Sequence, residues 1–254
     1  MEEKHRLAHP PDREADMIRG ILFDKDDTLV DLAAFWREPV RRTALWLAER
    51  CGRAGDAALI GRLESAAGFD GGVLRPGSPV AVDTNWRVMD ACGEVLTAEG
   101  LHMDPALREE GASYLETACI RYGDVVGKAD LRTLLPALRR RGIRLGVATS
   151  DHYGSAMHCL RRLGIETYFD LVLAADCVRE PKPAPEMARR FCEACGISPE
   201  ETAVVGDSGS DMRFARNSGL TGILLREDPA GPLPEGTGYV ISHLHQLPAL
   251  LDRL

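Results

Sequence analysis

Residues 21–31 read ILFDKDDTLVD, a short apolar run that leads directly into a cluster of carboxylates. The apolar residues have the length and composition of a buried strand. Asp24 and Asp26 follow in a turn, and the Thr28 hydroxyl lies two residues further on. Two carboxylates at this spacing repel each other and shift each other's pKa unless a cation or a substrate lies between them. The stretch therefore indicates a ligand site at the end of a strand, with a plain acidic turn as the alternative.

A calcium-binding loop is a further interpretation of these acids, and the sequence excludes it. An EF-hand loop that began at Asp24 would need glycine at its sixth position and a bidentate glutamate at its twelfth. Those positions hold Leu29 and Phe35.

Two downstream segments place further polar groups at the end of an apolar run or in a loop. Residues 144–151 read RLGVATSD, a strand pattern that ends in the hydroxyls of Thr149 and Ser150. Lys182 lies between two prolines, whose rings restrict the backbone on both sides of it.

A third segment, residues 202–211, reads TAVVGDSGSD. It is a strand pattern that opens into a glycine-rich turn, with Asp207 and Asp211 four residues apart. In an open parallel sheet the carboxyl ends of the strands meet along one edge, where ligands bind. The acids, hydroxyls and ammonium of these segments together suit a phosphate ester and a magnesium ion.

In this order, the four segments resemble motifs one to four of the haloacid dehalogenase superfamily of phosphotransferases, over nearly all of the chain from about Ile18 onward. The resemblance implies a nucleophile at Asp24, an acid/base at Asp26, a phosphate-binding hydroxyl at Thr149 and a neutralising ammonium at Lys182. It also implies a Mg²⁺ cofactor with these ligands: Asp24 and Asp207 through side chains, Asp26 through its backbone carbonyl, and Asp211 through water. Asp27 departs from the family pattern, which most often has glycine there and also accepts aspartate.

Lysine is rare in this chain, which strengthens the assignment of Lys182. Only four of its 31 basic residues are lysines, at positions 4, 25, 128 and 182, and the other 27 are arginines. A compact ammonium is retained where a point charge is needed in place of a planar guanidinium. Lys25 lies in the turn between the two acids, a position compatible with solvent exposure.

Size and charge indicate an intracellular, cytoplasmic enzyme. The chain has 254 residues, 44% of them hydrophobic, enough for one large core or two modest ones. A net charge of −8 argues against nucleic acid or an anionic membrane as the main partner. Residues 1–16 are polar and charged, unlike a secretory leader, and the apolar runs are too short to span a membrane. Nothing indicates the oligomeric state.

The seven cysteines do not form a recognisable metal or disulfide framework. Cys192 and Cys195 form a CxxC pair, but no second pair exists and both fall in a helical pattern over 184–196. We therefore expect free thiols.

The order of the periodic segments predicts an α/β fold with a Rossmann-like parallel sheet. Strands are expected at 18–24, 144–149, 171–175, 202–207 and 222–225. Helices are expected at 131–141, 152–163, 185–195 and 211–218.

About a hundred residues between the first two motifs cannot be a simple loop. Residues 32–129 contain helical patterns at 35–51, 57–65, 85–99 and 105–122 and no convincing strand, which predicts an inserted helical cap of the family's C1 type. The predicted domains are thus a core of residues 18–31 and 130–254, a cap of residues 32–129 and a polar N-terminal segment of residues 1–17.

Two regions are candidates for substrate contact besides the motifs. The segment 68–79, rich in glycine and proline, interrupts the cap helices, and Arg75 in it could bind a substrate carboxylate or second phosphate. The alternative is a surface connection with a solvated arginine. His152 and Ser150 lie next to Thr149 and are further candidates, while His243 and His245 are expected to be surface residues in a C-terminal turn.

The sequence therefore predicts a magnesium-dependent phosphatase of a small organic phosphomonoester, similar to the phosphoglycolate-phosphatase-like subgroup. A sugar phosphomutase uses the same core and is the enzymatic alternative. A dehalogenase lacks the acid supplied here by Asp26, and a phosphonate hydrolase would need a cap lysine, which residues 32–127 do not contain. A non-catalytic phosphate-sensing protein is opposed by the presence of Asp24, Asp26 and Lys182.

Overall fold

The computed structural model describes residues 17–82, 85–227 and 231–254. The polar segment predicted for residues 1–17 lies outside the described residues, apart from Met17. The chain divides into two compact units. Among the described residues, the first unit spans 17–24, 132–153 and 167–254, and the second spans 25–131 and 154–166. The core and cap boundaries set out above stay a prediction.

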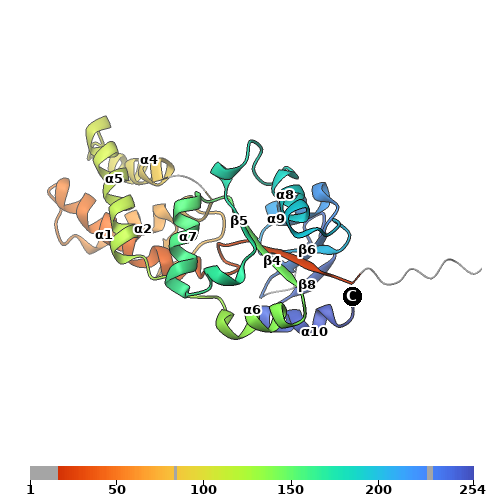
Figure 1. Cartoon of the computed structure of the whole chain (residues 1–254). Helices are drawn as coiled ribbons and strands as arrows, with labels where there is room; N and C mark the ends of the chain where they lie inside the picture. The colour runs from red at the N-terminus through yellow and green to blue at the C-terminus, as the bar shows by residue number, and fades with distance from the viewer. Residues whose placement is uncertain (1–16, 83–84, 228–230) are drawn as a thin grey trace, which may run out of the picture. The chain divides into compact units, whose positions relative to one another are not determined.

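The first unit is built on a six-stranded sheet in the order β5-β4-β1-β6-β7-β8 (Figure 1). All neighbouring strands are parallel, which confirms the predicted fold class. The central strand β1 pairs Phe23 with Val147 on one side and with Val205 on the other. The strands are β1 (Gly20–Phe23), β4 (Arg144–Ala148), β5 (Leu171–Leu173), β6 (Thr202–Gly206), β7 (Thr221–Leu225) and β8 (Tyr239–Ile241).

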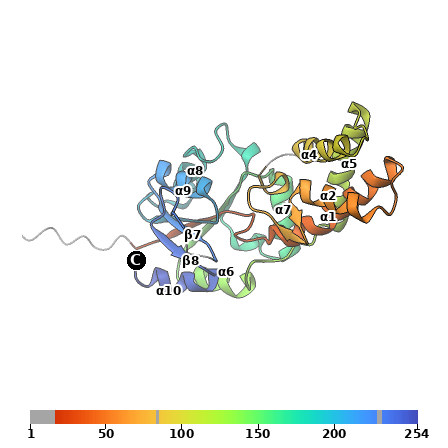
Figure 2. The same cartoon turned by 180° about the vertical axis from the view of Figure 1, so that it is seen from behind.

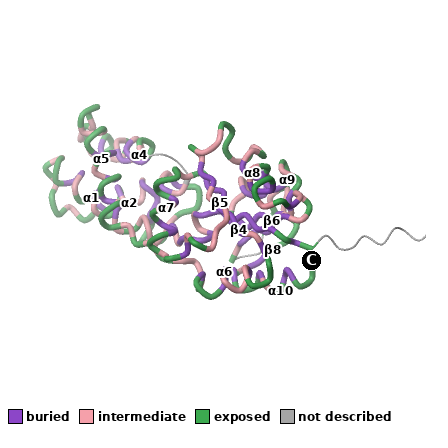
Figure 3. Tube along the Cα trace, viewed as in Figure 1, coloured by how far each residue is buried: buried purple, intermediate pink, exposed green. Residues whose placement is uncertain are grey.

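Helices cover both faces of this sheet. Helices α8 (Glu186–Cys195) and α9 (Gly209–Ser218) lie on one side, and α6 (Leu131–Arg140) and α10 (Leu247–Leu251) lie on the other (Figure 2). Short 3₁₀ turns complete the unit at Glu166–Tyr168, Ala175–Cys177 and Leu244–Gln246. Fully buried side chains such as Phe191 of α8 and Phe214 of α9 pack against the strands. The strand residues are accordingly almost all buried (Figure 3).

The second unit is helical, and aspartates begin three of its helices. The side chains of Asp31, Asp56 and Asp104 accept hydrogen bonds from the first turns of α1, α2 and α5, as N-cap residues do. Its core is a cluster that includes Leu47, Leu63 and other apolar side chains. The helices are α1 (Leu32–Arg50), α2 (Ala57–Ala67), α3 (Pro79–Val82), α4 (Asn85–Ala98), α5 (Pro105–Tyr122) and α7 (Tyr153–Leu163), the last from Gly154 onward.

The expectation of no strand in residues 32–129 is wrong. A small antiparallel hairpin pairs β2 (Phe69–Asp70) with β3 (Val73–Leu74). Gly71 and Gly72 connect them with φ of 58° and 84°, so both turn residues have the positive φ of a type I′ hairpin. Strands of two residues are too short to give an alternating pattern, which is why the sequence analysis found only a glycine-rich loop.

The bounds of the other predicted helices and strands agree with the structure to within a few residues. The unpredicted elements are short: β8, α3 and α10 have three to five residues each. All seven cysteines are free thiols, as expected. Within the described residues, no helix combines the length and apolar character that crossing a membrane requires.

Candidate active site

Asp24 lies at the carboxyl end of the central strand. Its backbone N–H donates to the carbonyl of Val205 at 2.8 Å, which extends the pairing of β1 with β6 by one residue. Asp24 is only 8% exposed. The parallel register therefore places Asp24 beside the end of β6, where Gly206 and Asp207 follow Val205.

Lys182 connects the acids of this sheet edge. Its Nζ lies 2.6 Å from Asp24 Oδ1 and 2.6 Å from Asp211 Oδ1, and its side chain is only 3% exposed. Burial by itself lowers the pKa of a lysine, but the carboxylates of Asp24 and Asp211 outweigh it and hold the pKa of Lys182 above the ordinary value. The ammonium is therefore charged throughout the neutral range.

The loop that carries Lys182 is fixed at two points. Ala184 N–H donates to Pro181 O at 3.0 Å, which closes a turn around Lys182 and Pro183. Asn217 of α9 donates from Nδ2 to Pro183 O at 2.9 Å. The loop is thus tied to α9, whose first turn contains Asp211.

Asp211 is held in place by the start of α9. Ser208 is the N-cap, and a capping box links it to Asp211: Ser208 N–H donates to Asp211 Oδ2 at 3.1 Å, and Asp211 N–H donates to Ser208 Oγ at 3.3 Å. The Ser208 hydroxyl also donates to Oδ2, at 2.5 Å. Together with Lys182 on Oδ1, these contacts use most of the acceptor capacity of the Asp211 carboxylate.

Gly206 makes room for this carboxylate. A Cβ on Gly206 would lie 2.4 Å from Asp211 Cγ and 2.5 Å from its Cβ, far inside van der Waals contact. Sequence reasoning missed Gly206 and Ser208. The signal for Ser208 was present, because a serine three residues before an acid at a helix start is the capping-box pattern.

The acids can hold a hard cation. One carboxylate oxygen from each of Asp24, Asp207 and Asp211 lies within 4.8 Å of the others. Asp24 and Asp211 are buried and Asp207 is exposed. A donor set of carboxylate oxygens alone suits Mg²⁺ and does not suit a soft metal. The residues therefore fit the predicted ion.

The hydroxyls at the end of β4 differ in exposure. Thr149 is buried, and its Oγ1 accepts from Asp151 N–H at 3.1 Å. Ser150 is exposed. His152 is exposed as well, with its Nδ1 3.6 Å from Asp176 Oδ2. All three belong to the first unit with Asp24.

Asp26 lies in the tight turn that begins the second unit. Leu29 and Val30 both donate their N–H groups to Lys25 O at 2.9 Å, and Asp27 N–H donates to Val30 O at 2.8 Å. Asp27 has a φ of 54°, in the left-handed region that glycine adopts most easily and aspartate tolerates. The backbone conformation therefore explains why glycine and aspartate are the alternatives at this position.

Lys25 does not face solvent, so that interpretation of the sequence is wrong. Its side chain is 4% exposed, and its Nζ donates to Asp26 Oδ1. The sequence could not distinguish the two outcomes, because the direction of the side chain depends on the turn and not on the spacing of the acids.

Arg75 is bound within its own loop. Its Nη1 lies 2.8 Å from Asp70 Oδ2, and its Nη2 donates to Ser65 O at 3.0 Å. The Ser65 hydroxyl donates to the other oxygen of Asp70, which lowers the pKa of that carboxyl, with Arg75 adding to the effect. These contacts stabilise the β2–β3 hairpin, and a role of Arg75 in substrate binding stays a prediction.

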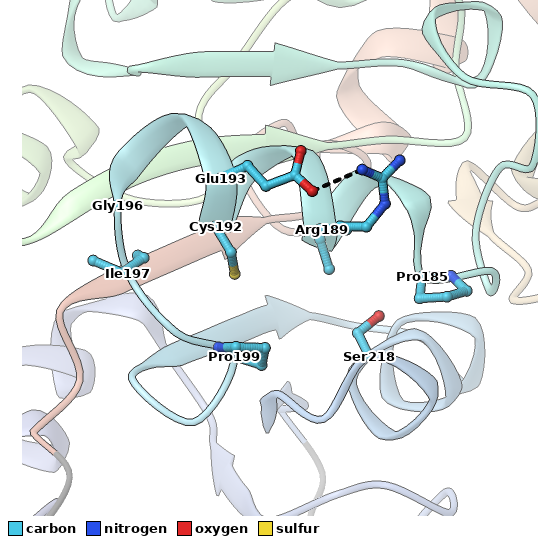
Figure 4. Close-up of a pocket in the computed structure, with 9 residues that line it drawn as sticks. Pro185, Arg189, Cys192, Glu193, Gly196, Ile197, Pro199 and Ser218 are labelled. Carbon is cyan, nitrogen blue, oxygen red and sulfur yellow. Dashed lines mark hydrogen bonds and ion pairs between the residues drawn. The ribbon is translucent and has the colours of Figure 1, made fainter.

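A groove of about 440 Å³ lies between α8 and α9 (Figure 4). Apolar atoms form most of its lining, and Arg189 and Glu193 form an ion pair at 2.7 Å beside it. Cys192 lines it, with its Sγ 3.6 Å from Thr202 Oγ1. None of the residues predicted for the site contributes to this groove, which therefore has no part in the candidate site.

Several known proteins are similar to this chain in sequence. A family model described as haloacid dehalogenase-like hydrolase matches residues 18–219. A phosphoglycolate phosphatase of Cereibacter sphaeroides is 30% identical over 239 residues, which cover 92% of this chain and 98% of that protein. A plasmid phosphoglycolate phosphatase of Cupriavidus necator is 34% identical over 120 residues, 46% of this chain, and the match spans only 52% of its length.

Among solved structures, a HAD-superfamily hydrolase of subfamily IA, variant 1, from Geobacter sulfurreducens is similar in fold. The TM-score is 0.65 at 22% identity, and the match covers 92% of this chain and 96% of that one.

Proposed function

The chain belongs to the haloacid dehalogenase-like hydrolase family, and from this premise we propose that it is a magnesium-dependent phosphatase of small organic phosphomonoesters. The observation that carries the proposal is the contact of Lys182 Nζ with Asp24 and Asp211, each at 2.6 Å. A buried ammonium shared by the strand-end acid Asp24 and by Asp211 in the first turn of α9 is the arrangement that an anionic nucleophile needs before it can approach an anionic substrate.

Asp24 is the proposed nucleophile. A carboxylate with an ordinary pKa of about 3.9 is ionised at neutral pH, so it needs no base to activate it. Its obstacle is the repulsion from the phosphate dianion. Lys182 offsets part of this repulsion, because its ammonium contacts Asp24 directly and is buried away from solvent.

The acids of the sheet edge would hold the magnesium ion. Asp24 and Asp207 would bind it through their side chains, Asp26 through its backbone carbonyl and Asp211 through a water molecule. The bonds that Asp211 already makes to Lys182 and Ser208 support the indirect role for this residue. When bound, the ion adds positive charge that stabilises the transferring phosphoryl group.

Asp26 is the proposed acid and base. In the first step Asp24 attacks phosphorus, the bond from phosphorus to the leaving oxygen breaks, and the Asp26 carboxyl gives its proton to that oxygen. In the second step Asp26 takes a proton from water as the water attacks the aspartyl-phosphate. Inorganic phosphate leaves and Asp24 is regenerated. Proton transfer of this kind contributes roughly 10²–10⁴-fold in rate.

Thr149 is the proposed ligand of a phosphoryl oxygen. It is buried at the end of β4, the strand that pairs directly with β1, and its hydroxyl can donate while it accepts from Asp151. Ser150 and His152 are exposed at the same strand end and would contact the substrate, as would Arg75.

The name of one relative supports the proposed substrate class. A relative that matches 92% of this chain is named phosphoglycolate phosphatase. This name supports a small carboxylated phosphomonoester as the substrate. A sugar phosphomutase would use the same groups, and a putative β-phosphoglucomutase from Thermotoga maritima has a similar fold. A cytoplasmic location stays a prediction.

The test is an assay of the purified chain on a panel of phosphomonoesters with phosphoglycolate, sugar phosphates and nitrophenyl phosphate. We expect release of inorganic phosphate that requires magnesium and stops on chelation. Full activity after exhaustive chelation would contradict the metal assignment, and an isomerised phosphate ester as product would indicate the mutase.

The nucleophile is tested separately. Fluoroberyllate should form an adduct on Asp24, and Asp24→Asn should lose at least about 10⁴-fold in kcat. The matched control is Asp90→Asn, the same substitution at an exposed residue of α4, which should retain full activity. An adduct on another residue, or an active Asp24→Asn protein, would refute the assignment.

A further inference from the structure

Every lysine in the described residues contacts an acid of the first motif. Lys182 pairs with Asp24, Lys25 with Asp26, and Lys128 with Asp27, the last at 3.8 Å. The chain has only four lysines against 27 arginines, so this placement is not a consequence of a lysine-rich surface. Lys182 has a role in the proposed function, but Lys25 has none so far.

Lys25 is built into the site by the backbone. In an extended strand the side chains of residues 25 and 26 would point to opposite faces. Here Lys25 O accepts two hydrogen bonds, from Leu29 and Val30, and the chain turns so that the two neighbouring side chains meet. The contact therefore depends on the same turn that carries the proposed acid and base.

The exposures of the two partners differ. The Lys25 side chain is 4% exposed, whereas that of Asp26 is 33% exposed. An ammonium removed from water costs several kcal/mol unless it is paired, and a partly exposed carboxylate would otherwise move freely among its rotamers. The buried Lys25 side chain therefore has little freedom to move, and it can restrain the partly exposed Asp26 carboxylate.

We propose that Lys25 is a positioning residue for Asp26: its buried ammonium holds the Asp26 carboxylate in one orientation through a charge-assisted hydrogen bond. This proposal rests on the proposed function, because it assigns a role in the proton transfers of Asp26. The two buried lysines then have different roles: Lys182 neutralises the proposed nucleophile Asp24, and Lys25 orients the proposed acid and base Asp26. The alternative is that Lys25 only stabilises the turn.

The decisive experiment is a double-mutant cycle of Lys25→Met and Asp26→Asn. Methionine keeps an unbranched apolar chain in the buried space and removes the ammonium. On an alkyl phosphomonoester, Lys25→Met should lower kcat/KM about 10- to 100-fold, the scale of a misplaced catalytic group. The loss should be smaller on nitrophenyl phosphate, whose leaving group needs no proton. In the Asp26→Asn background Lys25→Met should have almost no further effect, and independent, multiplicative losses would overturn the proposal.

Two further variants separate positioning from stability. Lys25→Arg keeps a charged donor and should retain most of the activity on the alkyl substrate; a loss as large as that of Lys25→Met would count against the proposal. Lys128→Met is the matched control, since it makes the same substitution in the lysine that pairs with Asp27, the residue next to Asp26. It should change both substrates equally, and its effect should persist in the Asp26→Asn background.

A structural measurement keeps the proposal testable if the enzyme assay fails. Crystal structures of the wild type and of Lys25→Met should show the Asp26 carboxylate in one orientation in the former and displaced or in several orientations in the latter. An unchanged Asp26 side chain would overturn the positioning role whatever the activity. If Lys25→Met does not fold, as judged by its thermal transition, Lys25→Gln takes its place with the same expected outcomes. Absence of phosphatase activity in the wild type, by contrast, would count against the proposed function alone.

Discussion

Two ion pairs of the same length lie in the two units of the molecule. Lys182 Nζ is 2.6 Å from Asp24 Oδ1 in the first unit, and Arg108 Nε is 2.6 Å from Asp90 Oδ1 in the second. The side chains of the first pair are 3% and 10% exposed, and those of the second are 38% and 42% exposed. Water can replace the partner in the second pair but not in the first, so equal distances do not mean equal importance.

The difference extends to the surroundings of each pair. Lys182 also contacts Asp211, which Ser208 holds, whereas the Arg108 guanidinium lies 4.8 Å from the centre of the exposed Trp86 ring. The contacts of Lys182 therefore depend on one another, whereas the partners of the Arg108 pair are exposed to water that can replace either of them. We expect a substitution of Lys182 to cause an abrupt loss and a substitution of Arg108 to have a small effect.

The largest expected effect is that of Lys182→Met. It leaves two buried carboxylates without their shared cation, so we expect kcat to fall about 10³-fold and the free energy of unfolding to fall by about 3–5 kcal/mol. Arg108→Met removes a pair of the same length and should change neither quantity measurably. Steady-state kinetics and denaturant titration test both variants, and similar losses in the two would break the comparison.

The second-largest effect is expected for Thr149→Ala. It should lower kcat/KM about 100-fold, because the buried hydroxyl is the proposed donor to the phosphoryl group. Thr149→Ser keeps the hydroxyl and should recover most of the rate. Thr43→Ala is the control in the helical unit: this buried hydroxyl donates to Pro39 O at 2.9 Å, and its loss should affect stability without affecting turnover. Equal rates in Thr149→Ala and the wild type would remove Thr149 from phosphate binding.

Gly206→Ala should raise the magnesium concentration needed for half-maximal activity by about 10- to 100-fold, the range for residues that support metal ligands. The added methyl group would overlap Asp211 and displace it. Gly61→Ala is the same substitution in the interior of α2, where nothing lies within 4 Å of the new atom. It should stabilise that helix slightly, since alanine is the better helix former. A magnesium activation curve identical to that of the wild type would show that Asp211 does not need its present position.

The smallest effect concerns Arg75. If it binds a substrate anion, Arg75→Ala should raise KM for phosphoglycolate about tenfold and leave nitrophenyl phosphate nearly unchanged. Asp70→Asn supplies the control, because Asp70 is the partner of Arg75 within the hairpin. A KM increase that Asp70→Asn reproduces on both substrates would assign Arg75 to the hairpin and not to the substrate.

The sequence predicted those parts of the site that follow from strand ends. Asp24, Thr149 and Asp207 each come directly after an apolar run, and a parallel sheet brings such positions to one edge whatever the details of packing. Long periodic helices were equally predictable, since four or five turns give a clear repeat.

What the sequence did not predict depends on contacts between side chains or on very short elements. The burial of Lys25 follows from the turn of residues 25–30, and the need for Gly206 follows from where the Asp211 side chain lies. Neither has a signal of its own in the chain. The β2–β3 hairpin has only two residues in each strand, too few for any period to be visible.

The distribution of the lysines also decides how the protein can be attached to a solid support. Amine-directed coupling needs an accessible ε-amino group, and the side chains of Lys25 and Lys182 are only 4% and 3% exposed. Among the described residues, that leaves Lys128, which is 25% exposed, as the one lysine open to a bulky reagent. Within the described residues, a support that carries activated esters would therefore couple through Lys128 and leave the two buried amines unmodified.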